Sequence, residues 1–399
     1  MYRGWSIVGT TMATQAAQAG LLIYGFSALA LPLEQEFGAT RFEVMIAATC
    51  LSLASSALAP LAGRWVDKGS VRSLMLGGAI ALALGLALVA AAQSIWQVWL
   101  AYALLLPLAN VLLGQLTSAA LVTRWFSERR GRAMGLSAMG TSIGGFVFPL
   151  LIASGAEAMG WRSAILVIGL VSAAILFCLI MLGIANRADG SERVLTPAET
   201  NTFDSGSATA RILASPAFWI ITLGVGVKLA TYLGFVSNLG GLAAGIGVEP
   251  VQAAGLVSIL SIISMIGKLA FGALAERFSA RSLFIAALAS TIAGFALLTI
   301  ASSLGMLALA CLLLGLSTGG MLPLWSLIVG QYFGEASFGR ALGLTNLAMV
   351  PLTAAASPLA GWAHDRTGSY DAAIWGSIAG LAVATVLLLF LPQSRVASS

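Results

Sequence analysis

The sequence predicts an all-α membrane protein of twelve transmembrane helices, arranged as two pseudo-symmetric six-helix bundles. Of the 399 residues, 59% are hydrophobic and 9% are charged, whereas a soluble domain carries about 25% charged residues. Apolar runs long enough to cross roughly 30 Å of hydrocarbon recur along the whole chain. The segment GRWVDKGSVR at 63–72 returns as GALAERFSAR at 272–281, which indicates an internal repeat.

The repeat extends beyond this segment. Its anchors are separated by about 209 residues, and they pair Gly63 with Gly272, Asp67 with Glu276, Arg72 with Arg281 and Pro149 with Pro358. The run GRAMGL at Gly131 is matched by GRALGL at Gly339, one residue out of step. Two halves that share one sequence pattern predict two parallel helix bundles, and a binding site is expected where the bundles face each other.

Twelve apolar runs follow one another along the chain, six in each half. They are centred near Gln18, Ser52, Ala83, Ala109, Ile143, Ser172, Lys228, Ser264, Thr291, Leu316, Val350 and Val383. The longest polar stretch separates the sixth run from the seventh and is too polar to span a membrane. We therefore expect an N-terminal bundle at 1–186, a cytoplasmic linker at 187–214 and a C-terminal bundle at 215–399.

The first run extends from about Trp5 to Pro32 without a cleavage site after a short apolar core, so it is expected to be a retained span. Lys and Arg are distributed unevenly between the two sides of the membrane. We assign fifteen of them to the side that holds both terminal segments and the connections after even-numbered spans. Three, Arg41, Arg162 and Arg366, fall on the opposite side. Both termini are therefore expected in the cytoplasm. This asymmetry accounts for the net charge of +5, so the expected partner is a lipid bilayer and not nucleic acid.

The short sequence matches to enzyme, metal and phosphate-binding motifs do not lie in the structural surroundings that those motifs require. Cys50, Cys178 and Cys311 show no metal spacing. The pattern Gly-Thr-Ser-Ile-Gly at 140–144 lies in an apolar helix, where a hydrolase nucleophile would need a strand and a sharp turn. The Gly-Lys pair at 267–268 lacks the glycine that opens a phosphate loop. We expect no catalysis, metal or cofactor, and energy from gradients instead of ATP.

The loop after the second span carries a charged cluster. Gly63 permits two helix ends to approach closely, while Asp67, Lys68 and Arg72 form a charged latch. This layout resembles the major facilitator superfamily, although the second glycine arrives one place early and the intermediate base is missing. The resemblance implies two latches that hold the halves together on the cytoplasmic face in the outward-open state. The second latch and the expected partners are Gly272, Glu276, Arg277, Arg281, Arg124 and Arg340. The alternative is that these charges are solvated and only set topology.

A narrower resemblance covers TRWFSERRGRAMGLSAMGTSIGGFVFP at 123–149. An aromatic pair, a basic cluster and a glycine-rich helix follow one another there, which is similar to the monocarboxylate transporters and the oxalate/formate exchangers. The glycines form a helix surface nearly free of side chains, at Gly131, Gly135, Gly140, Gly144 and Gly145. Close packing of neighbouring spans is the expected role of this surface, and substrate contact is the alternative.

Two lysines are the most chemically informative residues. Lys228 and Lys268 lie inside the seventh and eighth spans, where a cation costs roughly 2.5–3.5 kcal/mol on insertion scales. All fifteen acids fall at helix ends or in loops. A buried cation without a protein anion must lose its proton, reach water or meet an external anion. The third possibility predicts a site for an anionic substrate, with snorkelling or cavity lining as the alternative.

Lys268 also stands at an informative position in the resemblance. The segment SIISMIGKLAFGALAER resembles the eighth span of the carboxylate-transporting relatives, which implies that this cation binds a substrate carboxylate. The relatives usually carry Arg there. The monocarboxylate transporters also carry a lysine in span 1 and an acid in span 8, and the exchangers carry a lysine in span 11. This chain has none of these three residues. Because lysine is a point charge, Ser264, Tyr232 or Asn238 would have to orient the carboxylate.

Lys228 is expected within roughly 10 Å of the depth of Lys268. Two cations could hold a dicarboxylate, or one carboxylate with one lysine neutral or serving as a proton carrier. Weaker candidates for substrate binding are Asn110, Gln115, Trp325 and Asn346, for which hydrogen bonding between helices is the alternative.

These observations favour a carrier of small organic anions, monocarboxylates in particular, that works by alternating access. Moving a bare anion into a cell costs about 2.3 kcal/mol per 100 mV, whereas symport with a proton is electrically neutral. Exchange of anions or dicarboxylates is the alternative, and a receptor or sensor with the same fold is an alternative of another class. A functional monomer in a bacterial inner membrane is expected.

Overall fold

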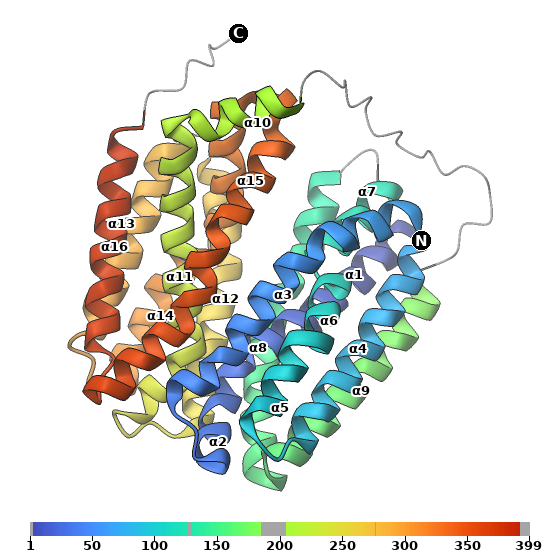
Figure 1. The fold of residues 1–399 in the computed structure, drawn as a ribbon, viewed down its shortest axis with the longest axis vertical. Coiled ribbons are helices and arrows are strands. Elements are labelled where there is room, and N and C mark those ends of the chain that lie inside the picture. Colours follow the sequence, from blue (N-terminus) through green and yellow to red (C-terminus); the bar gives the residue numbers. More distant parts are fainter. Residues whose placement is uncertain (1–2, 127–129, 185–204, 276, 392–399) are drawn as a thin grey trace. The chain divides into compact units, whose positions relative to one another are not determined.

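The computed structural model describes residues 3–126, 130–184, 205–275 and 277–391, and this part of the chain is almost entirely helical (Figure 1). It contains the twelve spans that the sequence predicts. They are Gly4–Phe37, Arg41–Val66, Val71–Ala91, Ile95–Val122, Arg132–Met159, Trp161–Gly183, Pro216–Ala244, Pro250–Leu274, Ala280–Leu298, Leu304–Gly334, Ser337–Thr367 and Asp371–Leu389. The predicted fold class is confirmed.

The chain packs into two units. Unit 1 comprises Met1–Val194 and Val236–Ile262, and unit 2 comprises Leu195–Phe235 and Ile263–Ser399. Most of the predicted linker, residues 187–204, lies outside the described residues, and its last part forms helix α10 (Ser205–Ala214). The predicted boundaries at 186 and 215 stay a prediction.

Unit 1 contains the first six spans. Their elements are α1 (Arg3–Ala19), η1 (Gly20–Tyr24), α2 (Phe26–Phe37), α3 (Arg41–Lys68), α4 (Val71–Ala91), α5 (Ile95–Leu100), η2 (Ala101–Leu105), α6 (Leu106–Leu113), α7 (Gln115–Trp125), α8 (Arg130–Met159) and α9 (Trp161–Gly183). The π-helical turns η1 and η2 interrupt the first and fourth spans. Within η2, the Tyr102 ring meets the Phe26 ring of α2 edge-on, with the centroids 5.4 Å apart.

Helix α8 packs along α1 through its glycines, as the sequence predicts. A Cβ atom on Gly140 would collide with the Met12 carbonyl oxygen, and one on Gly144 would collide with that of Ala16. Gly135, by contrast, has open space around it. Two of the five glycines therefore bring the backbones of α1 and α8 together, the contact typical of small residues between membrane helices.

Unit 2 is built mainly from α10, α11 (Pro216–Ala244), α12 (Pro250–Leu274), α13 (Ala280–Leu298), α14 (Leu304–Gly319), α15 (Met321–Thr367) and α16 (Asp371–Leu389). Helices α11 and α12 also contribute residues 236–262 to unit 1. Within α15, Gly334 has a φ of 68° and separates the tenth span from the eleventh. Only glycine adopts this conformation readily.

The internal repeat is visible in the helix ends. Ser70 caps α4 and Ser279 caps α13, each accepting a hydrogen bond from the backbone three residues later. Gly38 and Gly247 both have positive φ angles, of 59° and 78°. Both pairs are separated by 209 residues, the offset of the loop motif. The two halves thus share turns and caps as well as sequence.

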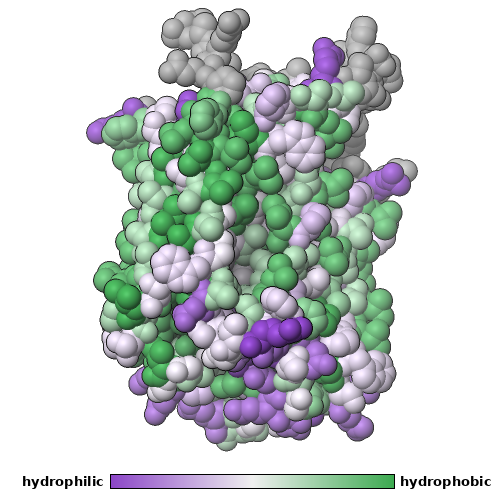
Figure 2. All heavy atoms as spheres, turned by 60° about the vertical axis from the view of Figure 1, so that its left-hand side comes forward, coloured by the Kyte–Doolittle hydropathy of each residue, from purple (hydrophilic) through white to green (hydrophobic). Residues whose placement is uncertain are grey.

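The outer surface is apolar, as expected for spans that face lipid. Large apolar side chains are exposed on both units, including Leu182, Leu104, Leu269 and Val383. Figure 2 shows one face, on which apolar side chains cover the middle while hydrophilic ones gather most densely at the lower end. This distribution matches a chain whose middle layer lies in hydrocarbon.

Candidate functional site

The two lysines are the only charged residues that lie more than three positions inside a described span. Lys228 is twelve residues from the start of its span, and Lys268 is six residues from the end of its span. The acids within the described spans all lie at most three residues from a span end. The intramembrane charge predicted from the sequence is therefore present, and it belongs to α11 and α12.

Lys228 is held inside unit 2 by hydroxyl groups. Its side chain is 1% exposed, and Nζ donates hydrogen bonds to Thr291 Oγ1 on α13 at 2.6 Å and to Ser317 Oγ on α14 at 3.1 Å. The two hydroxyls lie 2.9 Å apart. Sequence reasoning did not identify Thr291 and Ser317 as site residues, although both are polar residues near the middle of apolar spans. The three side chains are called the hydroxyl ring below.

Lys268 is half-buried on α12, one turn after the buried Ser264, so the two side chains lie on the same side of the helix. The backbone of α14 passes close to this turn. A Cβ atom on Gly319 would lie 2.6 Å from the Lys268 amide nitrogen and would collide with the Ser264 carbonyl oxygen. A Cβ atom on Gly267 would collide with the Leu316 carbonyl oxygen. Glycine on both helices therefore lets the two backbones meet at the turn that carries Lys268.

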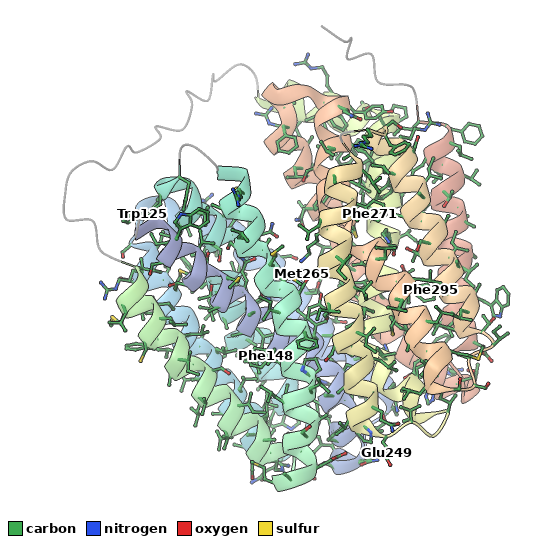
Figure 3. The ribbon with its side chains drawn as sticks, turned by 180° about the vertical axis from the view of Figure 1, so that it is seen from behind. Trp125, Phe148, Glu249, Met265, Phe271 and Phe295 are labelled. Carbon is green, nitrogen blue, oxygen red and sulfur yellow. The ribbon has the colours of Figure 1, made fainter. Side chains whose placement is uncertain are left out.

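Aromatic and thioether side chains flank Lys268 along α12. Figure 3 labels Met265 and Phe271, which stand three residues before and three residues after it. Phe271 is buried, and its ring occupies the space that a Cβ atom on Gly320 would need. The start of α15 thus packs against the turn of α12 that follows Lys268.

The remaining candidates in the C-terminal half differ in exposure. Tyr232 and Asn238 on α11 are buried, and Tyr232 stands one turn after Lys228. Trp325 on α15 is buried too, and its indole Nε1 has no hydrogen-bond partner among the described residues. Asn346 on α15 is exposed. Asn238 belongs to unit 1, whereas the other three belong to unit 2.

Asn110 is enclosed in a polar network of unit 1. Its side-chain oxygen accepts a hydrogen bond from Gln18 on α1, and its Nδ2 donates to Ser55 Oγ on α3 at 2.8 Å. The amide therefore joins three helices, which is the alternative role weighed for it in the sequence. Gln115, at the start of α7, is exposed.

A second network, not predicted from the sequence, joins α1 and α8. Gln15 Nε2 donates to Ser137 Oγ at 2.7 Å, and Ser137 Oγ donates to Thr11 Oγ1 at 2.8 Å. The side-chain oxygen of Gln15 is buried without a partner in the described part of the chain. Both networks place polar atoms along α1.

The repeated arginines of the loop motif cap helices in both halves. Arg72 Nη2 donates to the Met181 carbonyl oxygen at the end of α9, at 2.9 Å. Arg281 donates to the carbonyl oxygens of Leu389 and Leu391 at the end of α16, the latter at 2.8 Å. These carbonyls have no partner within their own helices, and a cation there also interacts favourably with the helix dipole.

The other latch residues are described only in part. Gly63 is half-buried, and Gly272, Arg277 and Arg340 are exposed. Arg124 Nη2 donates to the Val66 carbonyl oxygen on α3 at 2.6 Å, next to Asp67 in the chain. The side chains of Asp67 and Lys68 and the whole of Glu276 lie outside the described residues. The gate role of this set stays a prediction.

Comparison with known families gives one match that covers most of the chain. The family described as Major Facilitator Superfamily matches residues 12–349 and, in a second match, residues 231–399. A relative named Monocarboxylate transporter 13, from Rattus norvegicus, is 26% identical over 344 residues, which cover 84% of this chain and 76% of the relative. A relative named Uncharacterized MFS-type transporter YhjX, from Escherichia coli (strain K12), is 21% identical over 347 residues, covering 86% of this chain and 84% of the relative.

A solved structure shares the fold. It is a bacterial homolog of the human lysosomal transporter Spinster in an inward-facing and occupied conformation, with a TM-score of 0.75 and 15% identity. The match covers 98% of this chain and 97% of that chain. At this identity the likeness concerns the arrangement of the helices.

Proposed function

Because this chain belongs to the Major Facilitator Superfamily, and is therefore a membrane transporter and not an enzyme, we propose that it carries small organic anions, monocarboxylates in particular, together with protons by alternating access. The relatives named monocarboxylate transporters support the substrate class, at about a quarter identity over 84% of the chain. The charge distribution inside the spans supports it independently.

The observation that carries the proposal is the position of Lys268. It lies six residues inside a span whose neighbours offer no deep carboxylate among the described residues. A cation at such a depth is costly, and intramembrane charges mark substrate and ion pathways. A substrate carboxylate would supply the anion at Nζ, and the nearby Ser264 hydroxyl would hold its second oxygen.

Trp325 adds a second feature suited to a small acid. Its Nε1–H is a buried donor without an acceptor in the described residues, a situation that costs about 1–3 kcal/mol unless a partner arrives. A hydroxyl or keto oxygen next to the carboxylate would satisfy it, while the indole ring would cover the apolar part of the substrate. Trp325 and Lys268 both belong to unit 2.

Charge balance supports proton symport. A monoanion that enters with one proton moves no net charge, whereas alone it would meet about 2.3 kcal/mol per 100 mV of inside-negative potential. Exchange of one anion for another also balances charge, so the experiment must separate the two mechanisms.

The test is uptake of labelled lactate, pyruvate, benzoate, oxalate and succinate into proteoliposomes, with and without an inward proton gradient. We expect gradient-stimulated uptake of a monocarboxylate by the parent and loss of this uptake in Lys268→Gln, with partial retention in Lys268→Arg. Arg366→Gln is the matched control, because it removes an exposed charge one position from a span end. Uptake that needs an internal anion and ignores the proton gradient would replace symport with exchange. Unchanged uptake in Lys268→Gln would overturn the site.

We also propose that the repeated loops form the gate on the cytoplasmic side, with both termini in the cytoplasm of a bacterial cell and the monomer as the functional form. Neutralising one repeated acid, Asp67→Asn, should slow transport while substrate binding persists. A cysteine at Ser399 should react with an impermeant maleimide only after the cells are opened. Labelling of intact cells would reverse the assigned orientation.

A further inference from the structure

The hydroxyl ring of Lys228, Thr291 and Ser317 is a polar site that the binding of a carboxylate at Lys268 does not use. It joins α11, α13 and α14 within unit 2, and all three side chains are at most 2% exposed. Each hydroxyl has a further acceptor on its own helix: Thr291 Oγ1 lies 2.8 Å from the Ala287 carbonyl oxygen, and Ser317 Oγ lies 3.0 Å from that of Leu314.

The ring can hold Lys228 in either protonation state. It has five hydrogen-bonding contacts: two from Nζ, one between the hydroxyls and two to carbonyl oxygens. A neutral amine has two N–H groups and a lone pair, and it can either donate to both hydroxyls or accept from one. An ammonium donates to both hydroxyls while they donate to the carbonyls. Rotation of two O–H bonds converts one pattern into the other without moving a helix.

A carboxylate beside Lys228 would remove this property, because it would hold the ammonium permanently charged. Helices α11, α13 and α14 contain no Asp or Glu. Apart from Lys228 itself, the charged and titratable residues of helices α11 to α16 are Tyr232, Lys268, Arg281, Cys311, Tyr332, Glu335, Arg340, His364, Asp365, Arg366 and Asp371. Helix α10, which contacts α11 through Leu213 and Trp219, adds Arg211. Among the described side chains, the hydrogen-bond partners of Lys228 are only the two hydroxyls.

Apolar side chains enclose the ring. Ala287, Leu288 and Leu314, which flank the two hydroxyl residues on α13 and α14, are at most 2% exposed. One turn beyond Thr291, Phe295 (labelled in Figure 3) meets Phe235 of α11 edge-on, with the ring centroids 5.8 Å apart. In such surroundings a polar group with alternative hydrogen bonds is retained at a cost, which calls for a role beyond packing.

We propose that Lys228, Thr291 and Ser317 form a proton-binding site, separate from the carboxylate site, that takes up one proton from water and returns it to water in each transport cycle. The proton adds to the Nζ lone pair, and the two hydroxyls turn to accept from the new ammonium. The coupling role rests on the proton symport proposed above, whereas proton binding itself is tested without any substrate.

The direct test uses the small number of lysines. The chain contains Lys68, Lys228 and Lys268, so protein labelled with ¹³C at lysine Cε and placed in lipid nanodiscs should give three lysine signals. The signal missing from Lys228→Arg belongs to Lys228. We expect this signal to move between pH 5 and pH 9, and its midpoint to change in Thr291→Val and Ser317→Ala. Thr222→Val, which removes a buried hydroxyl of α11 outside the ring, should leave the midpoint in place.

A Lys228 signal that stays fixed over this pH range, or a midpoint that ignores both ring variants, would overturn the proton site. These results do not depend on transport. A parent protein that carries none of the five acids would refute the proposed function, while a moving signal would still establish the proton site.

Transport then tests the coupling, with the acid that the parent carries fastest. Net uptake driven by the proton gradient should be lost in Lys228→Met and Lys228→Arg, whereas exchange of labelled for unlabelled acid at equal pH should continue. Continued exchange also shows that both variants are folded. Gradient-driven uptake at the parent level in either variant would refute the coupling role.

Discussion

Replacing Gly319 with alanine tests whether the close contact between α12 and α14 sets the position of Lys268. The new Cβ atom would lie 2.6 Å from the Lys268 amide nitrogen and 2.8 Å from the Gly267 carbonyl carbon. Relaxing these contacts to about 3.5 Å, an ordinary van der Waals separation, requires α12 to move by about 1 Å. The obstacle is backbone, so no side-chain rotation relieves it. Overpacking of this kind costs about 1–3 kcal/mol of stability.

The same displacement should weaken transport, because Lys268 and Ser264 move with α12. We expect a lower thermal unfolding midpoint in detergent and a higher KM for gradient-driven uptake. Gly305→Ala is the matched control, since it lies on the same helix with open space around it, and it should change stability by less than about 0.5 kcal/mol. If Gly319→Ala matches the control in both measurements, the helix contact does not position the lysine.

Three further predictions concern hydrogen bonds within a single unit. Arg281→Gln removes hydrogen bonds to the end of α16 and should cost about 1 kcal/mol of stability. Thermal unfolding is compared with that of Arg277→Gln, which removes an exposed arginine, and equal midpoints would contradict the prediction. A double-mutant cycle of Gln18→Leu and Asn110→Leu should give a coupling of about 0.6 kcal/mol, and additive effects would show that their hydrogen bond contributes nothing. Thr40→Ala breaks the capping box of Thr40 and Glu43 at the start of α3 and should cost about 1 kcal/mol; an unchanged unfolding midpoint would refute that value.

Helix number and position follow from the sequence because a bilayer permits few solutions. Each backbone polar group must be paired inside its own span, so an apolar run of sufficient length has to be a helix. The internal repeat could also be predicted from the sequence, because a turn or a helix cap depends on the residue at a single position. Gly38 at a turn and Ser279 at a helix cap are examples. Such local rules need no knowledge of which helices become neighbours.

The partners of buried polar groups could not be found in this way. Lys228 was recognised as costly, but its contact with Thr291 and Ser317 depends on which faces of α11, α13 and α14 meet. In helices that are apolar on all sides, the periodicity of hydrophobic residues does not indicate which face meets a neighbouring helix. Arg72 shows the same difficulty. Its charge suggests a latch with an acid, whereas its hydrogen bond goes to the end of α9, a site that carries no signature in side-chain chemistry.

The repeat gives the hydroxyl ring a comparison within the same molecule. Gln18 and Asn110 join the first and fourth spans of the N-terminal half, and Lys228 and Ser317 join the first and fourth spans of the C-terminal half. Gln18 and Lys228 are 210 residues apart, and Asn110 and Ser317 are 207 apart, close to the repeat offset of about 209. A neutral amide suffices to join the helices in one half. A lysine in the corresponding network of the other half adds a group that can gain and lose a proton, which packing alone does not require.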